Sequence, residues 1–212
     1  MDENSKGNFV KEPFPEGENK QEPRKNFKDY LSFIWEIAKI ALIALVIVVP
    51  IRYFLFQPFI VSGDSMVPNF HSGDYLIVDE IAYKFSHLQR GDVIVFNFPE
   101  NPKEKFIKRV IGLPGETVGI VKGRVEIISK GKTEILNEKY LPVNLQTYRP
   151  DGTPQIEETT VKPGQYFVLG DNRTYSYDSR YWGIVPQNDI IGRVFLRIFP
   201  ITAFSEMSHQ TY

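Results

Sequence analysis

Cysteine is absent from the 212 residues, and only three histidines are present. The absence of cysteine excludes disulfide bonds, thiol catalysis and cysteine-ligated zinc. The histidines lie far apart in the sequence, so we expect no metal site and no cofactor. The formal net charge is −1, and no basic stripe with interleaved aromatic residues occurs. We therefore expect no nucleic-acid partner.

The amino-terminal part of the chain divides into two segments of different composition. Residues 1–29 are rich in Glu, Lys, Asn and Pro, which predicts a disordered tail. Residues 30–56 are mostly apolar and long enough to cross a bilayer, which takes about 20 residues. The uncharged run at 40–51 would by itself also suit a signal-peptide core or a buried helix. Bulky residues follow it instead of a small-x-small cleavage site, which favours an uncleaved transmembrane anchor.

The positive charges flanking this segment predict its orientation. Arg24, Lys25 and Lys28 precede the segment, whereas only Arg52 directly follows its uncharged run at 40–51. By the positive-inside rule, the amino terminus is cytoplasmic and the chain after the anchor is extracytoplasmic. We expect a single-pass protein of the cell membrane.

Residues 57–212 have the pattern of a mostly β domain. Short β-branched and aromatic runs alternate with Gly-Asp, Pro-Gly and Lys-Gly pairs, and we expect no helix beyond a turn at 79–85. Lys-Gly at 122–123 and at 130–131 predicts tight hairpin turns. The polar, proline-rich stretch 141–163 is expected to be a surface loop or the tip of an inserted β-subdomain. The expected strands cover residues 74–78, 92–98, 106–111, 117–121, 124–128, 165–169 and 192–199.

Ser65 and Lys108 are the candidate catalytic pair. A serine hydroxyl needs a base before it can act as a nucleophile, and no histidine here has a recognisable triad setting. A lysine can serve instead if burial lowers its pKa, and Lys108 has the apolar neighbours Phe106, Ile107 and Val110. Each residue alone also fits a structural interpretation, with Ser65 in a hydrogen-bonded turn and Lys108 solvated on an edge strand.

Residues 170–183 bring hydroxyl, acidic and arginine side chains together between apolar strands. Such a density of polar groups is costly to bury unless the groups bond to one another. Asp178 and Arg180 are expected to pair beneath a site, and Ser176 is suited to accept a hydrogen bond from an amine. Asp171, Asn172 and Arg173 are expected to support the fold.

The chain resembles the type I signal peptidases, which are membrane-bound serine proteases that remove signal peptides from exported proteins. The resemblance covers roughly residues 30–200. It rests on the anchor together with four ordered stretches: Ser-Met-x-Pro at 65–68, Gly-Asp-Tyr-Leu at 73–76, Lys-Arg-Val-Ile-Gly-Leu-Pro-Gly at 108–115, and Gly-Asp-Asn-Arg at 170–173 with Asp-Ser-Arg-Tyr-Trp-Gly at 178–183.

The resemblance implies roles for individual residues. Ser65 would be the nucleophile, Lys108 the general base and Ser176 the hydroxyl that orients the lysine. It also implies an all-β core of the signal-peptidase and repressor type, with a β insertion expected at 116–164. A pocket for the small residue before the cleaved bond would be lined by Phe59, Val61, Phe70 and Ile107.

The sequence departs from the family pattern near the nucleophile. Gly63 stands where some members have a serine that supplies a side-chain oxyanion donor. We expect the backbone N–H of Ser65 to supply one donor, and the second donor stays unassigned. Asn69 replaces a common threonine, and Thr174 and Tyr175 replace more usual Asp and Asn residues, with no mechanism attached to them.

The function expected from these features is membrane-bound cleavage of signal peptides from exported preproteins after small residues, by a Ser/Lys dyad. The expected partners are signal peptides, membrane lipid and the protein export machinery. Two alternatives stay open: a catalytically inactive, membrane-tethered β-domain that binds peptides, and a dedicated processing peptidase with a narrower substrate. A soluble autoprotease of the repressor type would carry a DNA-binding helical domain instead of an anchor.

Overall fold

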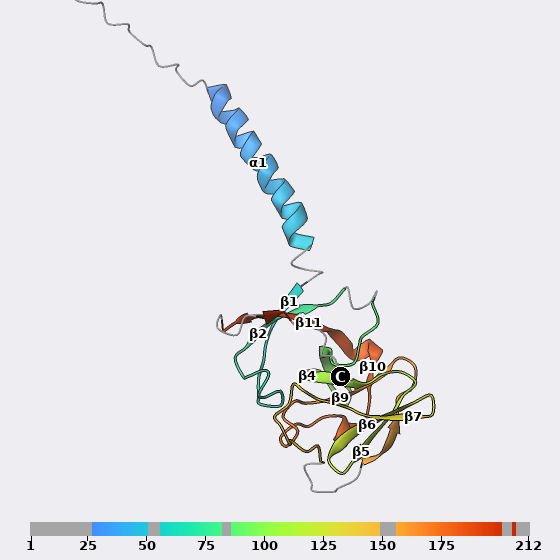
Figure 1. Cartoon of the computed structure of the whole chain (residues 1–212). Coiled ribbons are helices and arrows are strands. Elements are labelled where there is room, and N and C mark those ends of the chain that lie inside the picture. The colour runs from blue at the N-terminus through green and yellow to red at the C-terminus, as the bar shows by residue number, and fades with distance from the viewer. Residues whose placement is uncertain (1–26, 51–55, 82–85, 149–155, 201–204, 207–212) are drawn as a thin grey trace, which may run out of the picture. The chain divides into compact units, whose positions relative to one another are not determined.

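The structure is a computed structural model of the chain, and it describes residues 27–50, 56–81, 86–148, 156–200 and 205–206 (Figure 1). The chain divides into two compact units, residues 1–45 and residues 46–212. The tail expected at 1–29 lies almost entirely outside the described residues, as does part of the turn expected at 79–85.

The amino-terminal apolar segment forms the helix α1 (Phe27–Pro50). Within it, Tyr30–Val49 is long and apolar enough to cross a membrane. The structure describes this helix up to Pro50. Of the predicted anchor at 30–56, residues 51–55 lie outside the described residues, and Phe56 belongs to the first strand.

Most of the remaining chain is β structure, as predicted, and it forms two antiparallel sheets. The larger sheet has the strand order β1-β2-β11-β3-β4-β9-β10, and β12 pairs with β11. Each strand predicted for this sheet is present. In this sheet, the strands that the sequence did not predict are β1, β10 and β12. The bounds are β1 (Phe56–Ile60), β2 (Tyr75–Asp79), β3 (Val93–Phe98), β4 (Asn101–Gly112), β9 (Gln165–Leu169), β10 (Val185–Pro186), β11 (Ile190–Phe199) and β12 (Ser205–Glu206).

The smaller sheet has the order β7-β6-β5-β8 and lies between β4 and β9 in the sequence, inside the expected insertion. Both predicted hairpin turns are present. Lys122 and Gly123 have φ values of 49° and 76°, and Lys130 and Gly131 have 52° and 75°. Positive φ at both central residues is the type I′ turn. The strands are β5 (Thr117–Val121), β6 (Arg124–Ser129), β7 (Lys132–Ile135) and β8 (Ile156–Thr160), the last lying within the expected 141–163 loop.

One short helix corrects the expectation that the β domain has none. The helix α3 (Ser179–Trp182) begins after Asp178, whose side chain accepts a hydrogen bond from the Arg180 N–H. An aspartate at this position is a favourable N-cap. Because many polar residues surround Asp178, the sequence alone did not predict that a helix begins there. A second short turn, η2 (Gln187–Asp189), leads into β11.

The pairing of β4 places the candidate site. Its residues 105–109 pair with β3, but pairing with β9 begins only at Arg109. Within the described part of the chain, residues 105–108 therefore have no strand partner on the β9 side. Below this edge lies an apolar cluster of Val61, Met66, Phe70, Leu76, Val78, Val93, Val95 and Val194, with Phe59, Ile107 and Ile191 packed against it.

Candidate active site

Ser65 lies in a tight turn that follows β1. Gly63 has φ of 90°, a conformation that favours glycine, and Val67 N–H donates to the Asp64 carbonyl at 3.2 Å. Met66 and Phe70 are 0% and 1% exposed, so apolar burial within the turn and just after it fixes its position. The sequence predicted this turn correctly.

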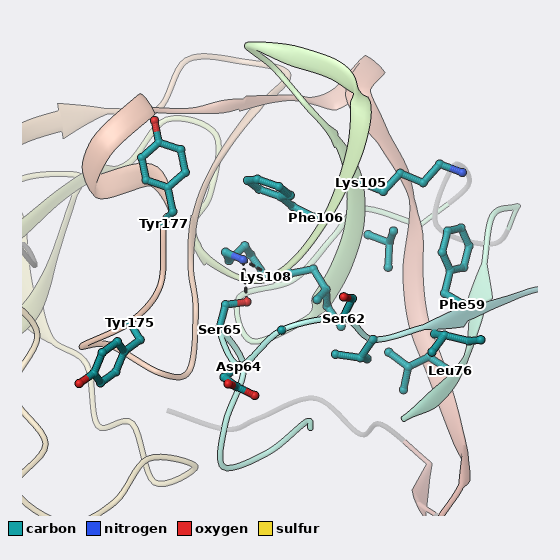
Figure 2. A pocket seen from close by; sticks show the side chains of 15 residues that line it. Phe59, Ser62, Asp64, Ser65, Leu76, Lys105, Phe106, Lys108, Tyr175 and Tyr177 are labelled. Carbon is teal, nitrogen blue, oxygen red and sulfur yellow. Dashed lines mark hydrogen bonds between the residues drawn. The ribbon is translucent and has the colours of Figure 1, made fainter. Parts of the chain in front are cut away.

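Lys108 meets Ser65 across 43 residues of sequence. Its Nζ donates hydrogen bonds to Ser65 Oγ at 2.9 Å and to the Ile107 carbonyl oxygen at 2.9 Å (Figure 2). The Nζ also lies 5.1 Å from the centre of the Phe106 ring. When the amine is neutral, the first contact can reverse so that the hydroxyl donates to the nitrogen lone pair. The geometry therefore allows proton transfer from Ser65 to Lys108.

Lys108 is only 4% exposed, and this burial changes the pKa of its ammonium group. Its pKa is lowered from 10.5 to about 8, mainly by the loss of hydration and to a smaller extent by the charge of Arg180. The carboxylates of Asp178 and Asp171 act in the opposite direction. Near neutral pH, a usable fraction of this lysine is thus an uncharged amine.

A cleft of about 330 Å³ opens beside the pair. Three of the four predicted pocket residues, Phe59, Val61 and Ile107, line it. Phe70 does not: it is buried in the apolar cluster below the cleft, where the Arg197 guanidinium lies 5.5 Å from its ring centre. The lining also includes residues that the sequence did not single out for this role: Ile60, Leu76, Val95, Lys105, Phe106, Tyr175 and Tyr177.

Some of these residues were within reach of sequence reasoning, and others were not. Phe106 and Lys105 directly precede Ile107 on the unpaired edge of β4, so a strand running past the nucleophile could have indicated them. Leu76 and Val95 come from two other strands, and only the folded sheet shows that they reach the same cleft.

Ser176 lies close to the pair but is not bonded to it. It is 1% exposed, and its Oγ has no hydrogen-bond partner among the described residues. Lys108 Nζ donates instead to Ser65 Oγ and to the Ile107 carbonyl oxygen. The expected orientation of the lysine by Ser176 is therefore not present as a hydrogen bond in this structure.

Asp178 and Arg180 form the expected pair. Asp178 accepts from Arg180 Nε and Nη2 at 2.7 Å each, and from the Gly170 N–H at 3.0 Å. Both side chains of the pair are fully buried. Arg180 also donates to the carbonyl oxygens of Arg173 and Ser176, at 2.6 and 3.3 Å. The pair therefore holds the loop between β9 and α3 in one conformation.

A second buried ion pair, which the sequence did not predict, lies behind the lysine. Arg109, the residue after Lys108, donates from Nε and Nη2 to the two carboxylate oxygens of Asp171 at 2.8 and 2.6 Å. Asn69 Nδ2 donates to the same carboxylate at 2.9 Å. Asn69 follows the nucleophile turn, so Asp171 links that turn to β4. This contact gives Asn69 a structural role that the sequence left open.

The sequence matches the family described as "Signal peptidase, peptidase S26" over residues 34–199. It is 36% identical over 187 residues to a protein named probable signal peptidase I-1 of Synechocystis sp., an alignment covering 85% of this chain and 90% of the relative. It is 40% identical over 172 residues to signal peptidase I of Leptolyngbya laminosa, covering 78% of this chain and 79% of the relative.

A crystal structure of a signal peptidase I from Enterococcus faecalis is 34% identical in sequence, with a TM-score of 0.40, and the match covers 51% of this chain and 97% of that one. The family match extends from within α1 to the end of β11, and the sequence relatives are covered over most of their length. The chain therefore belongs to the signal peptidase family, peptidase S26.

Proposed function

We propose that the chain cleaves signal peptides with Ser65 as the nucleophile and Lys108 as the general base. Membership of the family makes it a signal peptidase, and several relatives carry the name signal peptidase I. The observation that carries the residue assignment is the 2.9 Å contact between Lys108 Nζ and Ser65 Oγ at the edge of the cleft. Because burial lowers the pKa of Lys108, part of the lysine is neutral and can accept the Ser65 proton.

The proposed reaction proceeds through an acyl-enzyme. Neutral Lys108 takes the hydroxyl proton as Ser65 Oγ attacks the scissile carbonyl carbon. The carbon–nitrogen bond then breaks, and the lysine ammonium donates that proton to the departing amine. Water attacks the ester in a second cycle, in which Lys108 again accepts a proton and then returns it to Ser65 Oγ. Arginine at position 108 cannot replace it, because a guanidinium is not deprotonated in proteins.

The lining of the cleft also supports a preference for a small residue before the cleaved bond. Phe59, Val61 and Ile107 line the cleft together with Ser65, and we propose that this apolar wall receives the small side chain before the cleaved bond. Within the described part of the chain, residues 105–108 have no strand partner on the β9 side, and among their carbonyl oxygens that of Ile107 accepts a hydrogen bond from Lys108 Nζ. We propose that the peptide adds to this edge of β4 in an extended conformation.

When Ser65 attacks, the scissile carbonyl oxygen becomes an oxyanion, and we assign it one hydrogen-bond donor. The Ser65 backbone N–H makes no hydrogen bond within the described part of the chain, so it is available to a developing negative charge in the cleft. The neighbouring Gly63 N–H is directed to Ser72 Oγ at 3.4 Å. Gly63 has no side chain to supply the second donor.

Ser176, Asp178 and Arg180 are proposed as supporting residues. The buried hydroxyl of Ser176, which has no partner among the residues that the structure describes, is available to accept a hydrogen bond from the lysine ammonium formed during the reaction. Asp178 and Arg180 hold the backbone that carries Ser176, through the 3.3 Å contact of Arg180 with its carbonyl oxygen. Their role is mainly positional, and their opposite charges act in opposite directions on the pKa of Lys108.

The membrane topology is part of the proposal. The apolar helix Tyr30–Val49 anchors the enzyme, and the charge bias of its flanks favours a cytoplasmic amino terminus and an extracytoplasmic catalytic domain. Membrane lipid and the protein export machinery are the expected partners, because signal peptides emerge beside both.

The test is cleavage of a purified preprotein by the full chain in detergent. We expect wild type to release the mature protein, and Ser65→Ala and Lys108→Ala to release none. Lys103→Ala is a matched control, because Lys103 is an exposed lysine on the same strand that does not line the cleft. Equal cleavage by all four proteins would refute the dyad. Retained peptide binding with no cleavage by wild type would favour the inactive binding domain.

A further inference from the structure

The cleft extends past the dyad toward two tyrosines that the proposed chemistry does not use. Tyr175 and Tyr177 line the same cleft as Phe59 and Leu76. In Figure 2 the tyrosines lie on one side of the Ser65–Lys108 contact, and Phe59 and Leu76 lie on the other. The dyad therefore stands between an apolar part of the cleft and an aromatic part.

Tyr175 is unusually exposed for a large aromatic residue at a concave site. The residue is 82% exposed, whereas Tyr177 is 46% exposed and its ring lies 5.0 Å from Tyr181 and 5.9 Å from Phe98, centre to centre. An exposed tyrosine beside a cleft offers a large contact area with few rotatable bonds, the property that enriches tyrosine in binding sites.

The backbone that carries Tyr175 is fixed to the nucleophile turn. Asn172 donates from its backbone N–H to the Ser65 carbonyl oxygen at 3.0 Å and from Nδ2 to the Asp64 carbonyl oxygen at 3.0 Å. The Tyr175 N–H donates to the Asn172 carbonyl oxygen at 3.1 Å. The tyrosine is thus held at a defined distance from Ser65, and little conformational entropy of the backbone is lost when a ligand binds there.

A peptide cleaved at Ser65 must extend in both directions from the attacked carbonyl carbon. If the residue before the bond occupies the wall of Phe59, Val61 and Ile107, the chain after the bond runs toward the opposite part of the cleft. We infer that Tyr175, with Tyr177 beside it, binds the segment that follows the cleaved bond, the first residues of the mature protein. This inference rests on the proposed function and adds a leaving-side specificity residue to it.

The chemistry that suits this surface is an extended peptide with apolar or aromatic side chains. The two tyrosine rings can pack against such side chains and against the peptide backbone, and no charged side chain other than Asp64 and the two lysines lines the cleft. An aromatic contact of this kind is worth about 0.5–1.5 kcal/mol, which corresponds to a change of about 2- to 12-fold in kcat/KM.

The test compares two substrates with the same sequence before the bond. One continues for several apolar residues after it, and the other ends one residue after it as a glycine amide. We expect Tyr175→Ala to lower kcat/KM about 5-fold for the long substrate and less than 2-fold for the short one. Tyr175→Phe should stay near wild type, because the ring makes the contact. Val143→Ala, which shortens an 89% exposed side chain not lining the cleft, should change neither value.

A second readout uses the product. A free peptide matching the leaving segment should inhibit wild type competitively, and Tyr175→Ala should raise its inhibition constant by the same factor. Equal loss on both substrates, or no loss on the long one, would overturn the inference. Activity on the short substrate shows that the variant is folded. Cleavage by Ser65→Ala would instead overturn the proposed function, so the two failures are distinguishable.

Discussion

Gly170 lies so close to Ser176 that a methyl group on its α-carbon would come within 2.1 Å of Ser176 Oγ. The same methyl group would come within 2.4 Å of the Ser65 carbonyl oxygen. No side chain therefore fits between the nucleophile turn and the loop before α3. Glycine at position 170 sets how closely these two parts of the site approach.

Gly170→Ala is expected to displace the nucleophile and reduce activity by about 100-fold, the effect typical of a misplacement of about 1 Å. Removing the Ser176 hydroxyl in the double variant should not restore activity, because the Ser65 backbone still clashes. Gly119→Ala is the control, since its methyl group would meet nothing closer than 3.7 Å. Kinetics on a peptide substrate measure both, and near-normal turnover by Gly170→Ala would contradict the packing.

The pH dependence of cleavage should follow Lys108. The amine must be neutral to accept the Ser65 proton, and its pKa is about 8. We therefore expect kcat/KM to rise about tenfold per pH unit well below pH 8 and to level off above it. The measurement is kcat/KM from pH 6 to 10, and a kcat/KM that still rises about tenfold per pH unit between pH 9 and 10 would mean that the lysine keeps its ordinary pKa.

Lys108→Met should abolish cleavage and stabilise the fold. Burial lowers the pKa of this lysine from 10.5 to about 8. At pH 7 the charged lysine therefore lowers the free energy of unfolding by about 3 kcal/mol. Between pH 8 and 10.5 the unfolded chain binds more protons than the folded one, so wild-type stability rises with pH. The advantage of the variant should thus be full below pH 8 and disappear near pH 10.5, as followed by unfolding in detergent. A less stable variant at pH 7 would contradict this expectation.

Arg109→Met should destabilise the protein by about 3–5 kcal/mol, because it leaves the fully buried Asp171 carboxylate without its cation. The double variant Arg109→Met with Asp171→Leu should cost less than the sum of the single variants. Arg193→Met serves as the comparison, since Arg193 lies 3.8 Å from Asp92 and its side chain is 22% exposed. Although the Asp92 side chain is only 4% exposed, the pair is too long for a hydrogen bond, so Arg193→Met should cost less than Arg109→Met. Denaturant unfolding of the variants measures these differences, and equal costs would show that burial does not govern them.

The sequence determined the features that depend on neighbours in the chain. A long apolar run before Pro50 specifies the helix, and Lys-Gly pairs specify the hairpins around β6, because backbone conformation at such positions follows from local sterics. Short β-branched and aromatic runs between turn-forming Gly pairs located the main strands. The residue types at 65 and 108 and their family pattern indicated the dyad before any geometry was known.

The tertiary structure decided everything that depends on contacts between distant segments. The lowered pKa of Lys108 comes from burial by several strands, and the approach of Ser65 depends on Gly170 having no side chain. Phe70 and Tyr175 show the same limit: both are aromatic, yet one is buried in the core and the other is exposed at the cleft. Burial is a property of the packed fold, and side-chain type alone does not reveal it.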